Sequence, residues 1–402
     1  MNVAAMTVAP DARLFLLDDE SVVFSEATQQ LHRLNTAATF LWIHADAGLD
    51  RAGLVHELGG LLATDATTAG AHVDETLDHW QAAGLLGSRN GVPLPRAVRV
   101  ESVDTPTLTR EFPDDLATDA VSAILRVRLL DRVAAIEFSD FATLRRTLPL
   151  INHLQYGGDA VDDIVLRVVH RERNYYLMLD GKPAGWCGAD ETIAPMVFAT
   201  VTNALVSACD YLMIIHCGVV GNGRGALMLP ASSGSGKTTL TAALCHAGYR
   251  YFTDEVALLQ REGCLLRPTP VPLCIKQPSW RLLGRKFPAL LDGPVYLRAD
   301  DKVCRYLAPG GAMQVADDVL TPVEHIVFPK YRPGSSGGLQ PISKAEALAR
   351  LLTECKATGG HLSHADIASI VIWLQRVQCR TLDVDDLNVA IDTLRAAFPL
   401  NP

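Results

Sequence analysis

The segment Gly225–Thr239, with the sequence GALMLPASSGSGKTT, predicts a phosphate-binding loop between a strand and a helix. Ala226–Leu229 is a short apolar run of strand length. The helix is predicted from Lys237 to Ala247, and Gly248 follows as its C-terminal stop. A strand, a small-residue loop and a helix in this order form the context that a Walker A motif requires.

The residue types of this loop suit the phosphates of a nucleotide. Gly234 and Gly236 minimise Cβ atoms, so the backbone can approach the phosphates and direct its N–H groups at their oxygens. Lys237 adds a positive charge near the β- and γ-phosphates, and the Thr238 hydroxyl is placed to ligate Mg²⁺. Ala231 replaces the first glycine of the motif, which alters the turn without removing the cradle. We therefore expect ATP and Mg²⁺ as cofactors, with the nucleotide bound by Ser232, Ser233, Gly234, Ser235, Gly236, Lys237, Thr238 and Thr239.

A pair of acidic residues follows the predicted helix. The segment Tyr249–Phe252 predicts a strand, and Asp254 and Glu255 lie just beyond its end. Asp254 is only 17 residues from Lys237, whereas a conventional Walker B carboxylate lies farther on, after an aliphatic strand. This short spacing separates the chain from the common P-loop enzymes.

Residues 96–395 resemble the HPr kinase-related kinases. The resemblance rests on Ile215–Val219 (IHCGV), Ala231–Thr239 and Gly248–Glu255, with a further stretch at Val327–Tyr331 (VFPKY). It implies an α/β fold with a P-loop domain like that of HPr kinase and PEP carboxykinase. The chain departs from true HPr kinases at Glu255, where they have Asp, and it lacks their C-terminal signature, so HPr itself is a poor candidate substrate.

This resemblance implies roles for individual residues. Asp254 would accept the proton of the attacking hydroxyl, Glu255 would bind Mg²⁺ together with Thr238, and Lys237 would stabilise the transferred phosphoryl group. His216 would bond Asp254 or the substrate phosphate, or else it is a satisfied histidine on the apolar strand predicted for Tyr211–Val220. Five downstream cations are either phosphate contacts or surface charges: Arg281, Arg298, Lys302, Arg305 and Lys330.

The first 90 residues predict a separate small α+β domain of winged-helix-like type. Three strands are expected at Arg13–Leu17, Ser21–Ser25 and Gln29–Leu34. Three helices are expected at Thr36–Ala45 after an Asn35 cap, at Arg51–Leu58 after an Asp50 cap, and at Ala69–Ala83. Gly, Pro, Ser and Asn cluster in Gly87–Pro95 (GSRNGVPLP), so we place the domains at residues 1–92 and 93–402.

Residues 11–88 resemble the PqqD-like peptide-binding domains known as RiPP recognition elements. The resemblance rests on Leu34–Ala38 (LNTAA), Leu41-Trp42 and Ala83–Leu86 (AGLL). It implies that the leader of a precursor peptide adds as a strand to the edge at Gln29–Leu34, against the helix Ala69–Ala83. A folded appendage or a dimerisation module is the alternative.

The remaining sequence is less specific. Within the second domain, residues 93–210 predict an α/β part and residues 211–402 the nucleotide-binding core, with a hairpin at Ile164–Val169 and Tyr175–Leu179 and a helix at Pro195–Ala208. The net charge of -9 argues against a nucleic-acid partner. No apolar run approaches the ~18 residues of a membrane span and no signal peptide precedes the first domain, so a cytoplasmic protein is expected. Nine cysteines without a C-x-x-C pair argue against a zinc or disulfide framework.

These observations together predict a peptide kinase. The first domain would hold the leader of a ribosomally made precursor peptide, and the second would phosphorylate a Ser or Thr hydroxyl in the same peptide. Two alternatives remain open: a nucleotide-gated peptide-binding module without phosphoryl transfer, and a small-molecule kinase with an unrelated N-terminal domain. HPr kinases form oligomers, so a homo-oligomer is also left open.

Overall fold

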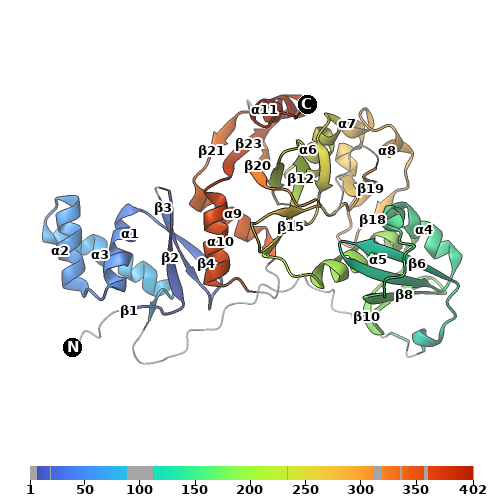
Figure 1. Cartoon of the computed structure of the whole chain (residues 1–402), viewed down its shortest axis with the longest axis horizontal. Coiled ribbons are helices and arrows are strands. Elements are labelled where there is room, and N and C mark those ends of the chain that lie inside the picture. The colour runs from blue at the N-terminus through green and yellow to red at the C-terminus, as the bar shows by residue number, and fades with distance from the viewer. Residues whose placement is uncertain are drawn as a thin grey trace. The chain divides into compact units, whose positions relative to one another are not determined.

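The computed structural model describes residues 7–18, 20–87, 112–113, 115–232, 234–310, 319–335, 337–356 and 361–401. The chain is a mixed α/β protein that divides into two compact units (Figure 1). The first unit contains residues 1–101, 341–353 and 359–379, and the second contains residues 102–340, 354–358 and 380–402. The predicted boundary at residues 92 and 93 lies outside the described residues.

The N-terminal part of the first unit contains the predicted elements in the predicted order. A three-stranded antiparallel sheet is formed by β2 (Ala12–Leu17), β3 (Glu20–Ser25) and β4 (Gln30–Leu34). The helices are α1 (Thr36–Asp46), α2 (Arg51–Leu62) and α3 (Ala66–Ala82), and β1 (Thr7–Val8) pairs with β5 (Leu86–Gly87). The predicted caps are confirmed, because Asn35 and Asp50 accept hydrogen bonds from backbone N–H groups in the first turns of their helices.

The first unit also contains two helices from far along the chain. Helix α9 (Lys344–Thr353) contacts β3 and β4, and α10 (His364–Leu374) contacts β2. Val23 belongs to the core formed with α1–α3, whereas its neighbour Phe24 packs edge-on against His364. Because successive side chains of a strand point to opposite faces, the sheet is covered on both sides. The sequence analysis predicts that residues 93–402 form one kinase domain. In the structure, residues 341–353 and 359–379 belong instead to the first unit.

Gln29 is the residue that links the two parts of this unit. Its φ of 55° ends the preceding turn, so β4 begins at Gln30 and the strand predicted from Gln29 starts one residue late. The Gln29 amide donates to the Leu362 carbonyl at 2.9 Å and accepts from the Leu362 N–H at 2.7 Å. The side chain thereby satisfies both backbone groups of a residue more than 300 positions away.

The second unit begins with a five-stranded sheet in the order β10-β9-β8-β7-β6. Its strands are β6 (Ala123–Leu129), β7 (Arg132–Phe138), β8 (Ile164–Arg171), β9 (Asn174–Leu179) and β10 (Lys182–Cys187). Helices α4 (Phe141–Ile151) and α5 (Asp190–Ser207) contact this sheet. The predicted hairpin of β8 and β9 is confirmed. The helix predicted for Pro195–Ala208 is present, but it begins five residues earlier, at Asp190.

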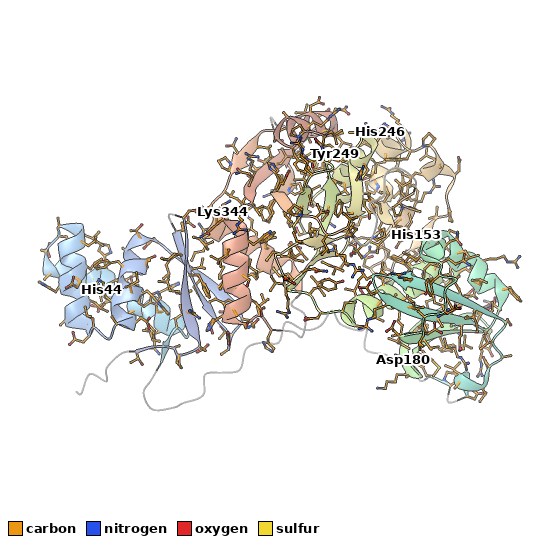
Figure 2. All side chains as sticks on the ribbon, viewed as in Figure 1. His44, His153, Asp180, His246, Tyr249 and Lys344 are labelled. Carbon is orange, nitrogen blue, oxygen red and sulfur yellow. The ribbon has the colours of Figure 1, made fainter. Side chains whose placement is uncertain are left out.

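The rest of the second unit is built around α6 (Lys237–His246). A six-stranded sheet has the order β14-β12-β13-β20-β23-β21, and α6 and α11 (Leu387–Ala397) share one hydrophobic core with it. Its strands are β12 (Cys217–Gly221), β13 (Ala226–Pro230), β14 (Arg250–Thr253), β20 (Val323–Tyr331), β21 (Leu339–Pro341) and β23 (Gln378–Val384). Tyr249, labelled in Figure 2, follows α6, stacks on Phe398 and donates a hydrogen bond to its carbonyl at 2.5 Å.

Two smaller sheets complete the second unit. One has the order β16-β15-β11-β22 and the other β17-β19-β18. Their strands are β11 (Met213–Ile215), β15 (Ala257–Leu259), β16 (Leu266–Arg267), β17 (Leu273–Lys276), β18 (Tyr296–Leu297), β19 (Val303–Leu307) and β22 (Cys355–Lys356), and the short helices are α7 (Trp280–Gly284) and α8 (Ala289–Asp292). The single strand predicted for Tyr211–Val220 is wrong, since β11 and β12 belong to different sheets and the chain changes sheet at His216.

Candidate phosphate-binding site

The glycine loop connects β13 to the N-terminus of α6, as predicted. Gly234 has a φ of +94° and Gly236 a φ of +89°, a conformation that side chains with a Cβ rarely adopt. A Cβ built at either glycine would meet no atom within 4 Å, so both glycines border open space. The loop closes by a hydrogen bond from the Ser235 N–H to the Ser232 carbonyl at 3.3 Å, and Ser233 lies outside the described residues. This backbone places the first residues of α6 along a cavity.

Lys237 and Asp254 form a buried pair at the base of the loop. Their side chains are only 6% and 3% exposed, although both carry ionisable groups. The Lys237 ammonium donates to the Asp254 carbonyl at 2.5 Å and lies 3.9 Å from its carboxylate Oδ1. Among the described residues, this Oδ1 is buried without a hydrogen-bond partner. Lys237 therefore holds Asp254 mainly through the backbone, and the carboxylate retains an unused acceptor.

Burial changes the acidity of Asp254. Removal from water raises its pKa to about 6, and this effect outweighs the opposing influence of Lys237 and the Thr238 side chain. A carboxyl group with a pKa near the working pH can exchange a proton during a reaction. Asp254 therefore has the acidity expected of a general base, the role predicted for it.

The loop and the carboxylate approach each other because β12 carries a glycine. A Cβ on Gly218 would lie 2.2 Å from the Thr241 hydroxyl of α6 and 3.4 Å from both the Asp254 carboxylate and the Lys237 side chain. A side chain at this position would therefore displace Thr241 and disturb the contact between the strand and the helix. Gly218 lies within the segment that carries the family resemblance, but the sequence alone assigns it no role.

His216 contacts Glu255, and no described hydrogen bond joins it to Asp254. Its Nδ1 lies 3.1 Å from the Glu255 carbonyl and 3.5 Å from the Glu255 carboxylate. Burial, and then the charge of Lys237, lower the pKa of His216. The His216 side chain is 37% exposed, and His216 lies between β11 and β12, outside both strands. His216 thus contacts Glu255 mainly through its backbone carbonyl.

A cavity of about 340 Å³ lies over the loop and collects positive charge. Two of the five predicted cations, Arg298 and Lys302, line it, and Lys276 joins them. Asp300 forms ion pairs with Arg298 at 3.1 Å and with Lys302 at 2.7 Å. The other three predicted cations, Arg281, Arg305 and Lys330, do not line this cavity.

Sequence analysis misses Lys276 because its strand bears no recognisable motif. Arg305 is committed elsewhere: its guanidinium lies 4.4 Å from the centre of the Trp280 ring and donates to the Leu290 carbonyl at 3.0 Å. Of the predicted cations, therefore, Arg298 and Lys302 are the ones that face the phosphate loop.

The donor groups of the cavity fit a nucleotide and Mg²⁺. The Ser235 hydroxyl and the Asp254 Oδ1 are buried polar atoms without a partner among the described residues, as expected when a ligand completes their bonding. The two residues predicted to hold Mg²⁺, Thr238 and Glu255, both line the cavity. Mg²⁺ is commonly held by one or two protein groups plus phosphate oxygens, so this small set is sufficient.

The elements predicted to hold a leader peptide lie together in the first unit. Strand β4 ends the described three-stranded sheet, so one of its edges has no neighbouring strand there. His32 of β4 lies beside α3: its Nε2 is buried without a partner among the described residues, and burial followed by the nearby His79 lowers its pKa. His32 of β4 and His79 of α3 are therefore close enough to influence each other electrostatically.

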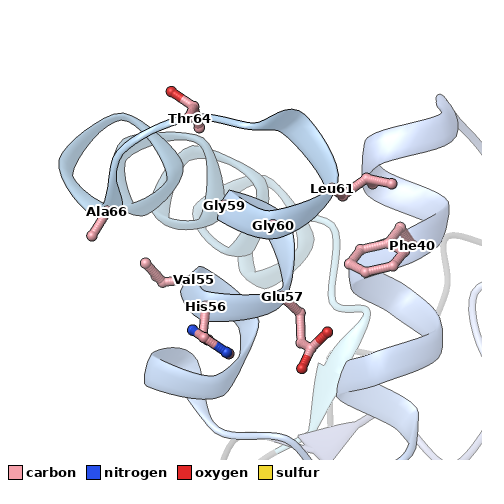
Figure 3. A pocket seen from close by; sticks show the side chains of 9 residues that line it. All are labelled: Phe40, Val55, His56, Glu57, Gly59, Gly60, Leu61, Thr64 and Ala66. Carbon is pink, nitrogen blue, oxygen red and sulfur yellow. The ribbon is translucent and has the colours of Figure 1, made fainter.

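A separate hollow of about 640 Å³ lies on α1 and α2 of the same unit (Figure 3). Leu61 lies near Phe40 on one side of it, and His56 lies near Val55 on the other, with Glu57 between the two pairs. None of its lining residues belongs to β4 or to the segment Ala69–Ala83, so it is distinct from the predicted peptide site.

Comparison with known proteins identifies no family for this chain. No protein-family model and no curated protein matches it. A weak structural neighbour is a solved complex described as TbiB1 with the TbiA(beta) leader peptide, which is 17% identical, covers 22% of this chain and 99% of that chain, and has a TM-score of 0.20. A TM-score of this size does not establish a shared fold. No helix among the described residues is long and apolar enough to cross a bilayer.

Proposed function

We propose that this protein is an ATP-dependent phosphotransferase that acts on a hydroxyl group of a peptide. The observation that carries the proposal is the buried Lys237–Asp254 pair beneath a loop with two left-handed glycines. A loop that only bound phosphate would need Lys237 and the helix N-terminus. Asp254, with an unused acceptor oxygen and a pKa near 6, adds a group able to take a proton.

The proposed reaction moves one phosphoryl group and one proton. The acceptor hydroxyl attacks the γ-phosphorus of ATP while the bond between that phosphorus and the β–γ bridging oxygen breaks, and ADP leaves. Asp254 takes the proton of the attacking hydroxyl. Lys237 and Arg298 neutralise charge on the phosphoryl oxygens, and Ser235 with the loop N–H groups orients the remaining phosphates. Mg²⁺, held by Thr238 and Glu255, would supply further charge neutralisation.

We assign the peptide to the first unit. In this proposal the leader of a precursor peptide adds as a further strand along β4, beside α3, and its hydroxyl-bearing core reaches the phosphate site. Binding at one site would raise the effective concentration at the other to about the millimolar range. The open strand edge of β4, and the electrostatic influence of His79 of α3 on His32 of β4, support this assignment.

Intact-mass spectrometry tests the reaction directly. The full chain would be incubated with ATP, Mg²⁺ and synthetic peptides that each contain a single Ser or Thr. We expect one phosphate to be gained by a subset of these peptides, and the gain to be lost in Asp254→Asn and Lys237→Ala. A Lys237→Ala variant that phosphorylates as well as the parent would overturn the assignment of the loop.

The two alternatives give different results in the same experiment. A nucleotide-gated binding module would bind peptide more tightly with ATP while no peptide gains mass. A small-molecule kinase would phosphorylate a low-molecular-weight alcohol and be insensitive to changes along β4.

A further inference from the structure

A second cavity, of about 460 Å³, adjoins the phosphate cavity in the second unit. Three residues line both cavities: Glu255, Cys274 and Arg298. The second cavity contains no residue of the loop 232–239, and it meets the first beside Glu255, the neighbour of the expected base. Its volume lies within the ~300–1,000 Å³ range typical of ligand pockets.

The position of the second cavity favours the acceptor over the nucleoside. In a P-loop the lysine and the acidic residues face the γ-phosphate, whereas the first turn of the helix faces the inner phosphates. Thr239, in that first turn, bonds Ser279 at 2.8 Å, and both residues line the phosphate cavity only. The nucleoside therefore lies toward Ser279, and the second cavity opens where the acceptor hydroxyl must arrive.

The walls of the second cavity are apolar and aromatic. Helix α5 contributes one face, with Thr192, Met196, Ala199 and Thr202 spaced three or four residues apart. Aromatic rings come from Trp186, Phe198 and Tyr306. Apart from Glu255 and Arg298 at the junction, no charged side chain lines it in the described part of the chain. Such a wall selects against a charged occupant, since burying an unpaired charge is costly.

One polar atom stands out on this wall. Thr202 is only 5% exposed, and its hydroxyl is buried without a partner in the described residues. Buried hydroxyls are normally hydrogen-bonded, so an occupant with a polar tip would complete this one. Tyr and Trp combine a large apolar ring with such a tip.

We infer that this cavity binds an aromatic side chain, Trp or Tyr, adjacent to the phosphorylated Ser or Thr of the peptide. The inference rests on the proposed kinase function and adds its sequence preference. The ring would pack against the α5 face and the aromatic walls, its polar atom would bond Thr202, and the neighbouring hydroxyl would point across Glu255 toward Asp254. Selection of the acceptor site would then depend on this residue as well as on the leader.

The test uses four synthetic peptides that differ only at the residue next to a single Ser: Trp, Phe, Ala or Asp. Steady-state phosphorylation by the full chain should give the order Trp above Phe, Phe above Ala, and Ala above Asp in kcat/KM. Equal kcat/KM for the Trp and Asp peptides would overturn the inference.

Two substitutions in the cavity sharpen this test. Thr202→Val keeps the shape of the side chain and should lower kcat/KM for the Trp peptide about 2- to 10-fold, the effect of one lost hydrogen bond, while the Phe peptide is unchanged. Ala199→Trp should fill the cavity and abolish the preference for the Trp peptide over the Ala peptide. Ser207→Trp, an exposed position on the same helix outside the cavity, is the control of matched size.

A binding measurement separates failure of this inference from failure of the proposed kinase. Affinity of the four peptides would be measured with a non-hydrolysable ATP analogue, so no transfer is needed. If no peptide gains phosphate but the Trp peptide binds best and loses its advantage in Ala199→Trp, the cavity assignment holds and the kinase proposal fails. If Ala199→Trp weakens binding of the ATP analogue and leaves peptide selection unchanged, the cavity holds the nucleobase and the inference is wrong.

Discussion

Asp254→Asn should make the folded protein more stable while removing phosphoryl transfer. Asp254 is 2% exposed and its pKa is raised from 3.8 to about 6, so its ionised form is disfavoured by folding. Asparagine has nearly the same shape as aspartate and no charge. The substitution therefore removes the free-energy cost of burying the ionised carboxylate. The proposed reaction requires that cost, because the base must be ionised to accept a proton.

The size of this gain follows from the pKa. A rise from 3.8 to about 6 is about 2 pKa units, which corresponds to ~3 kcal/mol at a pH well above 6. Between these two pKa values the folded state binds more protons than the unfolded state, so stability falls as the pH rises through this window. The advantage of the Asn variant should therefore be about 3 kcal/mol at pH 8, smaller at pH 5, and nearly absent below pH 3.8. For a domain of this size, ~3 kcal/mol corresponds to roughly 6–12 °C in melting temperature.

Urea unfolding of the parent and of Asp254→Asn at pH 5 and pH 8, without nucleotide, measures this difference. Glu255→Gln is the matched control, since it removes a carboxylate from the adjacent residue, whose side chain is 48% exposed, and should change stability by no more than about 0.5 kcal/mol. A variant less stable than the parent at pH 8, or one with the same gain at both pH values, would refute the reasoning. A variant less stable than the parent would mean that the Asp254 carboxylate stabilises the buried Lys237 ammonium more strongly than the raised pKa implies.

Four further predictions address the loop, the base and the first unit. Lys237→Ala should abolish phosphorylation and leave peptide binding intact, whereas Lys302→Ala, which removes a half-exposed cation from the cavity rim, should only weaken ATP binding, as measured by a fluorescent ATP analogue. Gly236→Ala should weaken ATP binding sharply and destabilise the fold by about 1–2 kcal/mol, because its φ of +89° is strained for alanine; wild-type ATP affinity would contradict this. Phosphorylation should increase as the pH rises through about 6, as Asp254 loses its proton, and a rate independent of pH would exclude it as the base. Gln29→Ala should lower the urea midpoint by the equivalent of about 1–3 kcal/mol, because it removes two hydrogen bonds to Leu362 and a third to the Glu26 carbonyl; an unchanged midpoint would contradict their contribution.

The features predicted well from sequence are those specified by neighbouring residues. Asn35 and Asp50 each accept a hydrogen bond from an N–H group three residues later, so the caps can be identified from short segments. The glycine loop can also be identified from a short segment. Gly234 and Gly236 have left-handed backbone conformations, which favour glycine over other residues. The helix that follows ends at His246, one residue before the predicted Ala247, and Gly248 has a φ of +104°.

The features that escape sequence analysis depend on contacts between distant segments. Lys276 and Arg298 come from different parts of the chain and meet only because their segments border the same cavity. The apolar neighbours of His216 predict a position in the middle of a strand, yet the chain changes sheet there and turns the His216 side chain toward Glu255. Periodicity describes which residues are buried within one element, and it carries no information about which sheet an element joins.

The composition of the first unit changes how peptide recognition should be tested. Deleting residues 1–90 is the usual way to ask whether an N-terminal domain is needed, but here that deletion removes β2, β3 and β4, the strands that α9 and α10 contact. The apolar face of α9, which includes Leu348 and Leu351, would lose part of its cover, and the α10 N-terminus would lose its His364 contacts with Asp11 and Phe24. The truncated protein could therefore lose turnover because its uncovered apolar surface destabilises or aggregates it, and this result would look the same as a loss of peptide binding.

A substitution on the free edge of β4 avoids this ambiguity. Arg33 of β4 is exposed and lies opposite Val22 in the register, and proline there would remove one backbone N–H without uncovering α9 or α10. If β4 recruits the peptide as an added strand, Arg33→Pro should weaken peptide binding while ATP binding is retained. Because the same backbone N–H group could instead serve the β3–β4 ladder, the urea midpoint must be measured alongside: unchanged stability with weakened binding supports recruitment at the edge, and unchanged binding with unchanged stability places the peptide elsewhere.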